Sequence, residues 1–240
     1  MMFSLVDMAI GGVGLLMSLA ASGYVKYQFN KGKGVPISSG KTGAEIARAI
    51  LRHNDVNDVT VVEHQGFLSD HYSPTEKKLA LSPDVYNGRT AAAAGVAAHE
   101  VGHALQHAQG DLSMWGRTIL VYPAHFGSML GPILVGIGFF MAGARGMVEG
   151  TMAHTIAVIG LWAFGAAVLC STIIVVNEFN ASKRAKLALV SMGITRPGEE
   201  DQAVKGVLLA AGLTYLAAAL TAALHFAWYA YLVFGSRRDD

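Results

Sequence analysis

The stretch AAHEVGHALQH, residues 97–107, carries three histidines and a glutamate inside a chain that is otherwise mostly apolar. His99, Glu100 and His103 form the motif H-E-x-x-H, and His107 follows one helical turn further along. On an α-helix, His99 and His103 lie on the same face, the geometry that presents two imidazoles to one metal ion. The stretch therefore predicts a helix with a zinc site. The simpler alternative is an amphipathic helix whose polar face happens to carry histidines.

The composition of the chain indicates a membrane protein. Hydrophobic residues make up 52% of the 240 residues and charged residues only 15%, whereas a soluble domain has about 25% charged residues. The formal net charge of +1 gives no reason to expect a nucleic-acid partner. A single cysteine, Cys170, excludes an intramolecular disulfide framework and a metal site built on cysteines.

Four segments contain uncharged runs long enough to cross a bilayer, which takes about 20 residues. The first lacks a basic amino-terminal region and is followed by lysines, so we interpret it as a retained anchor and not as a signal peptide. The sequence thus predicts a mainly α-helical membrane protein in contact with the lipid bilayer. Its four transmembrane helices are expected at residues 1–25, 118–144, 150–177 and 206–236.

Basic residues are distributed unevenly over the segments that flank these spans. Ten lysines and arginines lie in 26–117 and five in 178–205, whereas only Arg145, Arg237 and Arg238 lie on the opposite side of the membrane. Because basic loops remain in the cytoplasm, both of these segments are predicted to be cytoplasmic and both termini external.

Residues 26–117 show the mixed pattern of a small α+β region. A capping box, T-x-x-E at residues 42–45, opens an amphipathic helix. The segments 59–63 and 78–82 resemble short strands, with a turn between them. A longer helix is expected over 91–109, capped by the threonine that precedes it.

A catalytic zinc ion needs a third protein ligand and an open fourth position. His107 is the nearest candidate, but side chains four residues apart drift by about 40° per step around an α-helix, which disfavours three such ligands on one metal. Glu178, at the start of a predicted cytoplasmic helix over 178–205, is the better candidate. Two spans separate it from His103, so both lie on the same side of the membrane. The alternative role for Glu178 is a carboxylate at the membrane boundary beside two basic residues.

Other polar residues are candidates for the chemistry of such a site. Glu100, next to a ligand, could act on a water molecule at the metal as general base. Tyr72 or His71, in the strand and turn region before the zinc helix, could stabilise an oxyanion. A turn-stabilising role for Asp70 and Tyr72 is the simpler alternative. An edge strand near the zinc helix would bind the backbone of a substrate.

Four segments together resemble the YugP-like family of membrane neutral zinc metallopeptidases. In chain order they are SGKTGAEIARAIL (39–51), GFLSDHYSPTEKKLALSPDVY (66–86), AAHEVGHALQH (97–107) and NEFNASKRA (177–185). The family is similar in layout to the HtpX-like and CAAX-prenyl membrane endopeptidases, in which a membrane-adjacent helix supplies a glutamate as third ligand. The resemblance implies this role for Glu178. In those relatives an aspartate follows four residues later, where this chain has Ser182.

The resulting prediction is a zinc metalloendopeptidase of a prokaryotic cell membrane, with a small cytoplasmic, gluzincin-like α+β region. One Zn²⁺ ion per chain would be held by His99, His103 and Glu178, with Glu100 as base. The substrates would be membrane or membrane-proximal proteins or peptides. The alternative is a non-catalytic membrane protein whose structural zinc ties the segment 26–117 to the third span. Such a site would close with four protein ligands.

Overall fold

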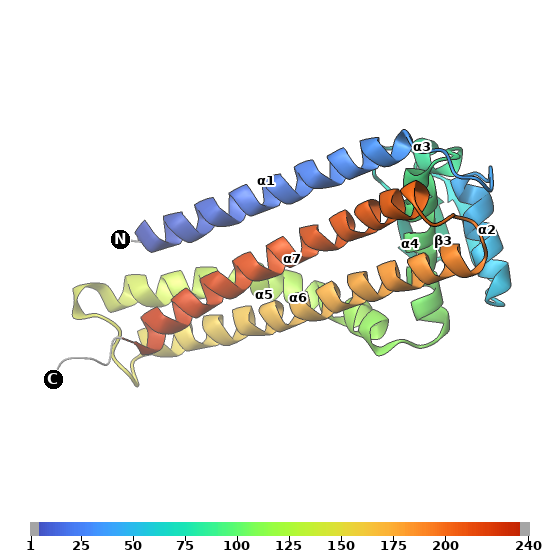
Figure 1. Ribbon diagram of the computed structural model, residues 1–240. Helices are drawn as coiled ribbons and strands as arrows, with labels where there is room; N and C mark the ends of the chain where they lie inside the picture. The colour runs from blue at the N-terminus through green and yellow to red at the C-terminus, as the bar shows by residue number, and fades with distance from the viewer. Residues whose placement is uncertain (1–4, 236–240) are drawn as a thin grey trace. The chain divides into compact units, whose positions relative to one another are not determined.

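Four long helices make up most of the chain in the computed structural model, which describes residues 5–235 apart from the side chains of Arg117, Thr118 and Arg145 (Figure 1). Each helix is long and apolar enough to cross a membrane, which confirms the four apolar spans predicted from the sequence. The outer ends of the predicted spans, residues 1–4 and 236, and the two arginines after them lie outside the described residues. The four helices are α1 (Leu5–Lys33), α5 (Leu112–Ala142), α6 (Met152–Ser191) and α7 (Glu199–Phe234).

Helix α6 extends well beyond its predicted span. It continues through residue 178 to Ser191, so residues 178–205 do not form a separate helix but the end of α6, a turn and the start of α7. The stretch 177–191 contains no glycine or proline, and the helix ends before Gly193, whose φ of 63° only glycine adopts easily. At about 1.5 Å per residue, 40 residues measure about 60 Å, twice the apolar thickness of a bilayer. Part of α6 must therefore project from any membrane that it crosses.

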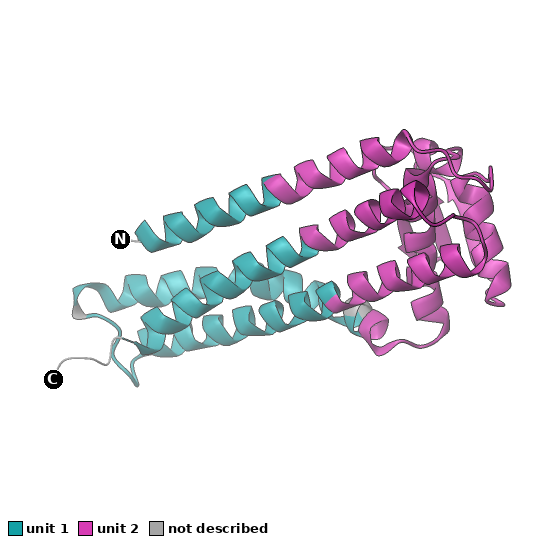
Figure 2. Cartoon of the chain, in the orientation of Figure 1, with its two compact units in different colours: residues 1–19, 116–175, 215–240 teal, residues 20–115, 176–214 magenta. Residues whose placement is uncertain are grey.

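The chain divides into two compact units, and the boundary between them cuts through all four long helices, α1, α5, α6 and α7 (Figure 2). Most of the apolar length of the long helices belongs to unit 1, and the strands, the shorter α-helices and the polar ends of the long helices belong to unit 2. Unit 1 is Met1–Leu19, Gly116–Val175 and Tyr215–Asp240, and unit 2 is Ala20–Trp115 and Val176–Thr214.

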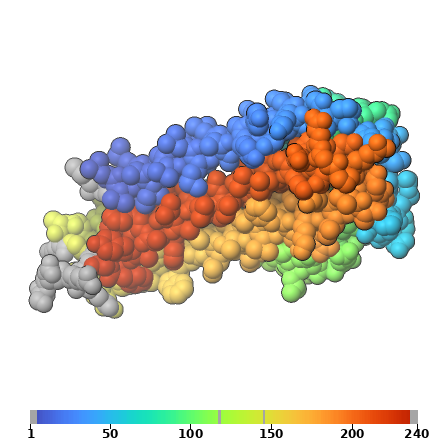
Figure 3. Space-filling view, viewed as in Figure 1, coloured from blue at the N-terminus to red at the C-terminus, as the bar shows by residue number. Residues whose placement is uncertain are grey.

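Glycines let the helices of unit 1 approach one another closely. A Cβ atom on Gly160 of α6 would lie 2.6 Å from the carbonyl oxygen of Gly131 on α5, so only glycine fits at this crossing. The start of α1 lies beside the end of α7 (Figure 3), and Thr221 occupies the space that a Cβ atom on Gly14 would need. Small residues at such crossings provide the close packing on which helix association in a membrane depends.

Unit 2 contains a three-stranded sheet, of which the sequence predicted two strands. The two predicted strands, β1 (Thr60–Glu63) and β3 (Lys78–Leu81), are confirmed and pair in parallel. A third strand, β2 (His71–Ser73), lies antiparallel to β3 at an edge of the sheet, where the sequence predicted a turn. Three residues are too few to show the alternation by which strands are recognised.

Helix α4 (Ala91–Ala108) is buried over almost its whole length in unit 2. Its Thr90 cap is confirmed, because the threonine side chain accepts a hydrogen bond from the backbone of Ala93. The predicted capping box is also present at the start of α2 (Gly43–His53). The short helix α3 (Pro83–Tyr86) connects β3 to the segment before α4, and a 3-10 turn, η1 (Gly143–Arg145), follows α5.

A glycine sets the distance between α4 and α6. A Cβ atom on Gly102 would lie 2.5 Å from the backbone oxygen of Ala181, so the two backbones are nearly in contact. The core of unit 2 combines side chains of the sheet and the short helices with side chains of α6 and α7. Its members include Ile46, Ile50, Leu79, Leu81, Val101, Leu189, Val204 and Val207.

Replacing Gly102 with alanine should lower the stability of the protein, because the added methyl group would overlap the Ala181 carbonyl and overpacking costs about 1–3 kcal/mol. Thermal unfolding of the detergent-solubilised chain measures the effect. Gly23→Ala in α1 is the matched control, since no atom lies within 4 Å of the new Cβ, and it should leave the stability unchanged or raise it by up to about 1 kcal/mol. Equal melting temperatures for the two variants would contradict the close approach of α4 to α6.

Candidate active site

His99 and His103 lie on the same face of α4, one turn apart. Both side chains are buried, and their ring centroids are 4.8 Å apart at nearly a right angle. The spacing of four residues brings the rings together because side chains at i and i+4 lie one above the other on a helix. The structure thus contains the pair of adjacent imidazoles that the sequence predicted.

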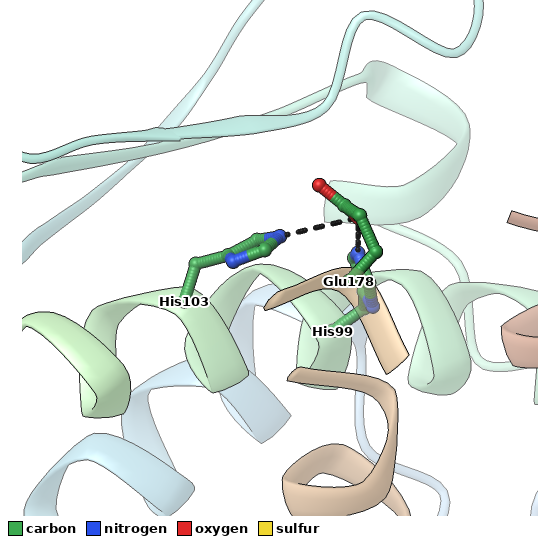
Figure 4. Close-up of side chains that lie close together, drawn as sticks. All are labelled: His99, His103 and Glu178. Atoms are coloured by element: carbon green, nitrogen blue, oxygen red, sulfur yellow. Dashed lines mark hydrogen bonds and ion pairs between the residues drawn. The ribbon is translucent and has the colours of Figure 1, made fainter. Parts of the chain in front are cut away.

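Glu178 joins the two histidines from α6. Its Oε2 atom lies 3.2 Å from Nε2 of His99 and 3.5 Å from Nε2 of His103 (Figure 4). One possible ligand atom from each residue lies within 4.8 Å of the other two, and Glu178 is only 1% exposed. A carboxylate so deeply buried requires nearby positive charge or hydrogen-bond donors. Two imidazole nitrogens and a carboxylate oxygen are a donor set that zinc takes in catalytic sites, so these residues fit a zinc ion.

The outer nitrogen of each imidazole contacts a neutral oxygen. His99 Nδ1 lies 3.1 Å from Oγ of Ser182, and His103 Nδ1 lies 3.0 Å from Oε1 of Gln106. The hydroxyl group of Ser182, four residues after Glu178 on α6, therefore contacts the imidazole of His99. Gln106 was not among the residues predicted from the sequence. The signal for it was its spacing of three residues from His103, which places both on one helix face.

Glu100 is buried on α4 and influences Asp70. Burial raises the pKa of Asp70 above its usual value and the nearby Glu100 carboxylate adds to the shift, against hydrogen bonds from Ser82 that lower it. Asp70 accepts hydrogen bonds from the backbone N–H and the hydroxyl group of Ser82, at 2.7 and 3.1 Å. These bonds tie the residue before β2 to the residue after β3, which is a structural role for Asp70.

Tyr72 and His107 form a hydrogen-bonded pair between β2 and the last turn of α4. The Tyr72 hydroxyl oxygen lies 2.8 Å from Nδ1 of His107. Burial, with a contribution from the charge of Asp58, raises the pKa of Tyr72 to about 12, so its hydroxyl group stays protonated at neutral pH. Among the described residues, the group of close ligand atoms contains Glu178 and not His107, which favours Glu178 as the third ligand.

His71 is exposed at the start of β2. Its Nδ1 atom lies 2.8 Å from the backbone oxygen of Ser69, and its ring packs edge-on against His64 with 5.5 Å between centroids. Strand β2 lies at the edge of the sheet and contacts α4. An edge strand therefore lies next to the helix that carries the two buried histidines.

The chain is similar to known proteins along nearly its whole length. Residues 8–234 match a family model described as "Putative neutral zinc metallopeptidase". The chain is 40% identical over 233 residues to the "Putative membrane protease YugP" of Bacillus subtilis (strain 168), and the match covers 97% of both chains. No solved structure matches the chain. The chain therefore belongs to the family of neutral zinc metallopeptidases that this family model describes.

Proposed function

We propose that the protein is an integral membrane zinc endopeptidase that hydrolyses peptide bonds of membrane or membrane-proximal proteins. The observation that carries the proposal is the buried group of His99, His103 and Glu178, whose members come from two helices and lie up to 79 residues apart in sequence. Membership of a zinc metallopeptidase family supports the same chemistry. The relative named as a membrane protease supports the location.

Each side chain has a distinct role in this proposal. His99, His103 and Glu178 hold one Zn²⁺ ion per chain. Zinc, when bound, supplies a Lewis acid that lowers the pKa of a water molecule towards neutrality. The carboxylate of Glu100 accepts a proton from the attacking water and delivers it to the nitrogen of the leaving amine.

Tyr72 is the proposed donor to the oxyanion that forms on the substrate carbonyl. Its hydroxyl group is protonated at neutral pH, and His107 can donate Nδ1–H to the phenol oxygen, which leaves the phenol proton free for the substrate. His71, on the same strand, is the alternative donor. The edge of β2 would bind the substrate backbone as an added strand.

The position of Glu178 on α6 supports a substrate at the membrane surface. It follows the apolar run IIVV at residues 173–176, whose last member, Val176, is 57% exposed, as a lipid-facing side chain would be. Glu178 lies two residues further, or about 3 Å along the helix axis. The basic residues of 26–117 and 178–205 support a cytoplasmic location for this side.

A structural zinc site is the alternative function. Structural zinc sites are closed by four protein ligands, whereas catalytic sites have three and keep one position open. Among the residues that the structure describes, the group of close ligand atoms has three members, and Glu100 adds a buried carboxylate on the same helix as two of them. Three ligands favour the enzyme.

Substitutions at Glu100 and Glu178 should separate the base from the ligand. Glu100→Gln removes the base but no ligand, so metal analysis should still find about one zinc per chain while turnover falls by roughly two or more orders of magnitude. Glu178→Ala removes a ligand, so zinc and activity should both be lost. The melting temperature should also fall, because metal binding is coupled to folding.

Activity in these variants is measured as new peptide termini in a membrane proteome, identified by mass spectrometry. Glu63→Gln, an exposed position at the end of β1, is the control and should keep native zinc content and activity. Full zinc occupancy in Glu178→Ala would show that another residue is the third ligand. A native cleavage rate in Glu100→Gln would favour the structural site.

Removing the Tyr72 hydroxyl should slow catalysis without loss of metal. In Tyr72→Phe we expect kcat to fall by about 10²-fold, because the donor to the oxyanion is gone, while KM and zinc content stay near native values. Tyr86→Phe is the matched control, since that hydroxyl accepts a hydrogen bond from Arg48 outside the site. If Tyr72→Phe keeps the native kcat, His71 becomes the candidate donor.

Cysteine labelling tests the proposed orientation in the membrane. Lys41→Cys and Arg196→Cys should resist a membrane-impermeant thiol reagent in intact cells, whereas Val148→Cys, on the opposite side, should react. All three positions are exposed, and the native chain with Cys170 gives the background. Reaction of the first two and protection of the third would reverse the orientation.

A further inference from the structure

Gln106 is a fully buried amide beside the proposed zinc site, and all of its hydrogen-bonding groups have partners. Its Oε1 atom accepts hydrogen bonds from His103 Nδ1 and from Asn177 Nδ2, both at 3.0 Å. Its Nε2 group donates to the backbone oxygen of Asn177 at 3.0 Å and to Oδ1 of Asn180 at 3.1 Å. A carboxamide offers two acceptor and two donor positions, so these four contacts use all of them.

These contacts allow only one orientation of the amide. A rotation by 180° would place the Nε2 group against the Asn177 side-chain N–H and the Oε1 atom against two other oxygens. With Oε1 directed at the imidazole, His103 must carry its proton on Nδ1, because an amide oxygen can only accept. Its Nε2 atom then presents a lone pair towards Glu178, 3.5 Å away, as a metal ligand must.

Arg184 and Asp111 hold the other end of this network in place. The Arg184 Nε–H group donates to Oδ1 of Asn180 at 2.6 Å, which fixes that atom as the acceptor for Gln106. Arg184 also pairs with Asp111 at 2.8 Å, and a hydrogen bond from Ser113 helps to hold the pKa of Asp111 below its usual value. The orientation of Gln106 is thus set by a charged pair that does not touch the zinc site.

The same amide connects the two helices that carry the proposed ligands. Gln106 lies on α4 three residues after His103, and Asn177 and Asn180 lie on either side of Glu178 on α6. Three of its four hydrogen bonds therefore end on the helical turn that contains Glu178: one on the side chain of Asn177, one on its backbone and one on the side chain of Asn180.

We propose that Gln106 is a positioning residue of the zinc site, which selects the Nδ1–H tautomer of His103 and holds the Glu178 turn of α6 against α4. The inference rests on the proposed function only in that zinc binds to His99, His103 and Glu178. It does not depend on peptidase activity, so zinc affinity is the direct readout.

The zinc affinity of the purified full chain in detergent, measured by competition with a chelating dye, tests this role. Gln106→Leu removes the acceptor for His103, and zinc should bind about 10–100-fold more weakly. Gln106→Glu keeps an acceptor oxygen for His103 but loses the two donors to the Glu178 turn, so its zinc affinity should lie between those of Gln106→Leu and the native chain. Gln28→Leu, which removes an amide that contacts Tyr24 in α1, is the matched control and should bind zinc like the native chain.

A second background distinguishes positioning of His103 from a general effect on folding. His103→Ala already weakens zinc binding severely, and adding Gln106→Leu to it should lower the residual affinity by a clearly smaller factor than in the native background, because only the contacts with the Glu178 turn remain to be lost. An equal loss with and without His103 would overturn the proposal. If Gln106→Leu does not fold, Gln106→Met replaces it, since a thioether is only a weak acceptor.

The outcomes separate this inference from the proposed function. A native chain that binds no zinc would refute the zinc site itself. A native chain that binds zinc, together with a Gln106→Leu variant that binds it equally tightly, would refute only the role of Gln106. With Co²⁺ in place of zinc, the visible absorption bands should shift in Gln106→Leu and not in Gln28→Leu, because the ring orientation at the metal changes only in the first.

Discussion

The contact between the Glu178 carboxylate and the Nε2 atoms of His99 and His103 requires α4 and α6 to pack with their backbones almost touching. Burial to 1% exposure removes the hydration shell of the carboxylate, at a cost of order several kcal/mol. Favourable interactions with groups within a few ångströms must offset this cost. The short distance is possible because Gly102 has no side chain opposite Ala181. The close packing of α4 against α6 and the close approach of the three ligand atoms therefore depend on each other.

The strands and short helices of residues 34–108 share one hydrophobic core with α6 and α7. The three strands contain at most four residues each, too few to bury a separate hydrophobic core. Leu189 of α6 and Val204 and Val207 of α7 complete the core, and they lie on helices whose other ends are apolar enough to cross a membrane. The continuity of α6 also explains how one helix can supply both a membrane span and Glu178.

Features that depend on residues close together in the sequence could be predicted, whereas features that depend on distant residues could not. Hydropathy and capping are local, so the spans, the two longer strands and the Thr90 cap were found. The count of spans placed Glu178 on the same side as the histidines, but not at 3.2 Å from one of them. Strand β2 and the unbroken α6 were missed, because a three-residue strand is defined by its partner and a helix end by the first residue that can stop it.

Gln106 shows the same limit within the candidate site. In the sequence it is an ordinary polar residue near the end of a helix, a position that is usually solvated. Its burial and its four hydrogen bonds depend on Asn177 and Asn180, which arrive from a helix about 70 residues later. No local pattern contains that information.

The polar network that runs from the imidazoles through Gln106 and Asn180 to Arg184 and Asp111 has neutral groups at its buried end and charged groups at its more exposed end. The groups that touch the imidazoles, Ser182 and Gln106, are neutral, whereas the side chains of Arg184 and Asp111 are 25% and 18% exposed. This order is favourable because a buried ion costs far more to desolvate than a buried amide. It also leaves Glu178 as the only formal charge among the three proposed ligands. With zinc bound, neutral oxygens behind both imidazoles would leave part of the charge of the ion uncompensated, which strengthens its attraction for a substrate carbonyl oxygen.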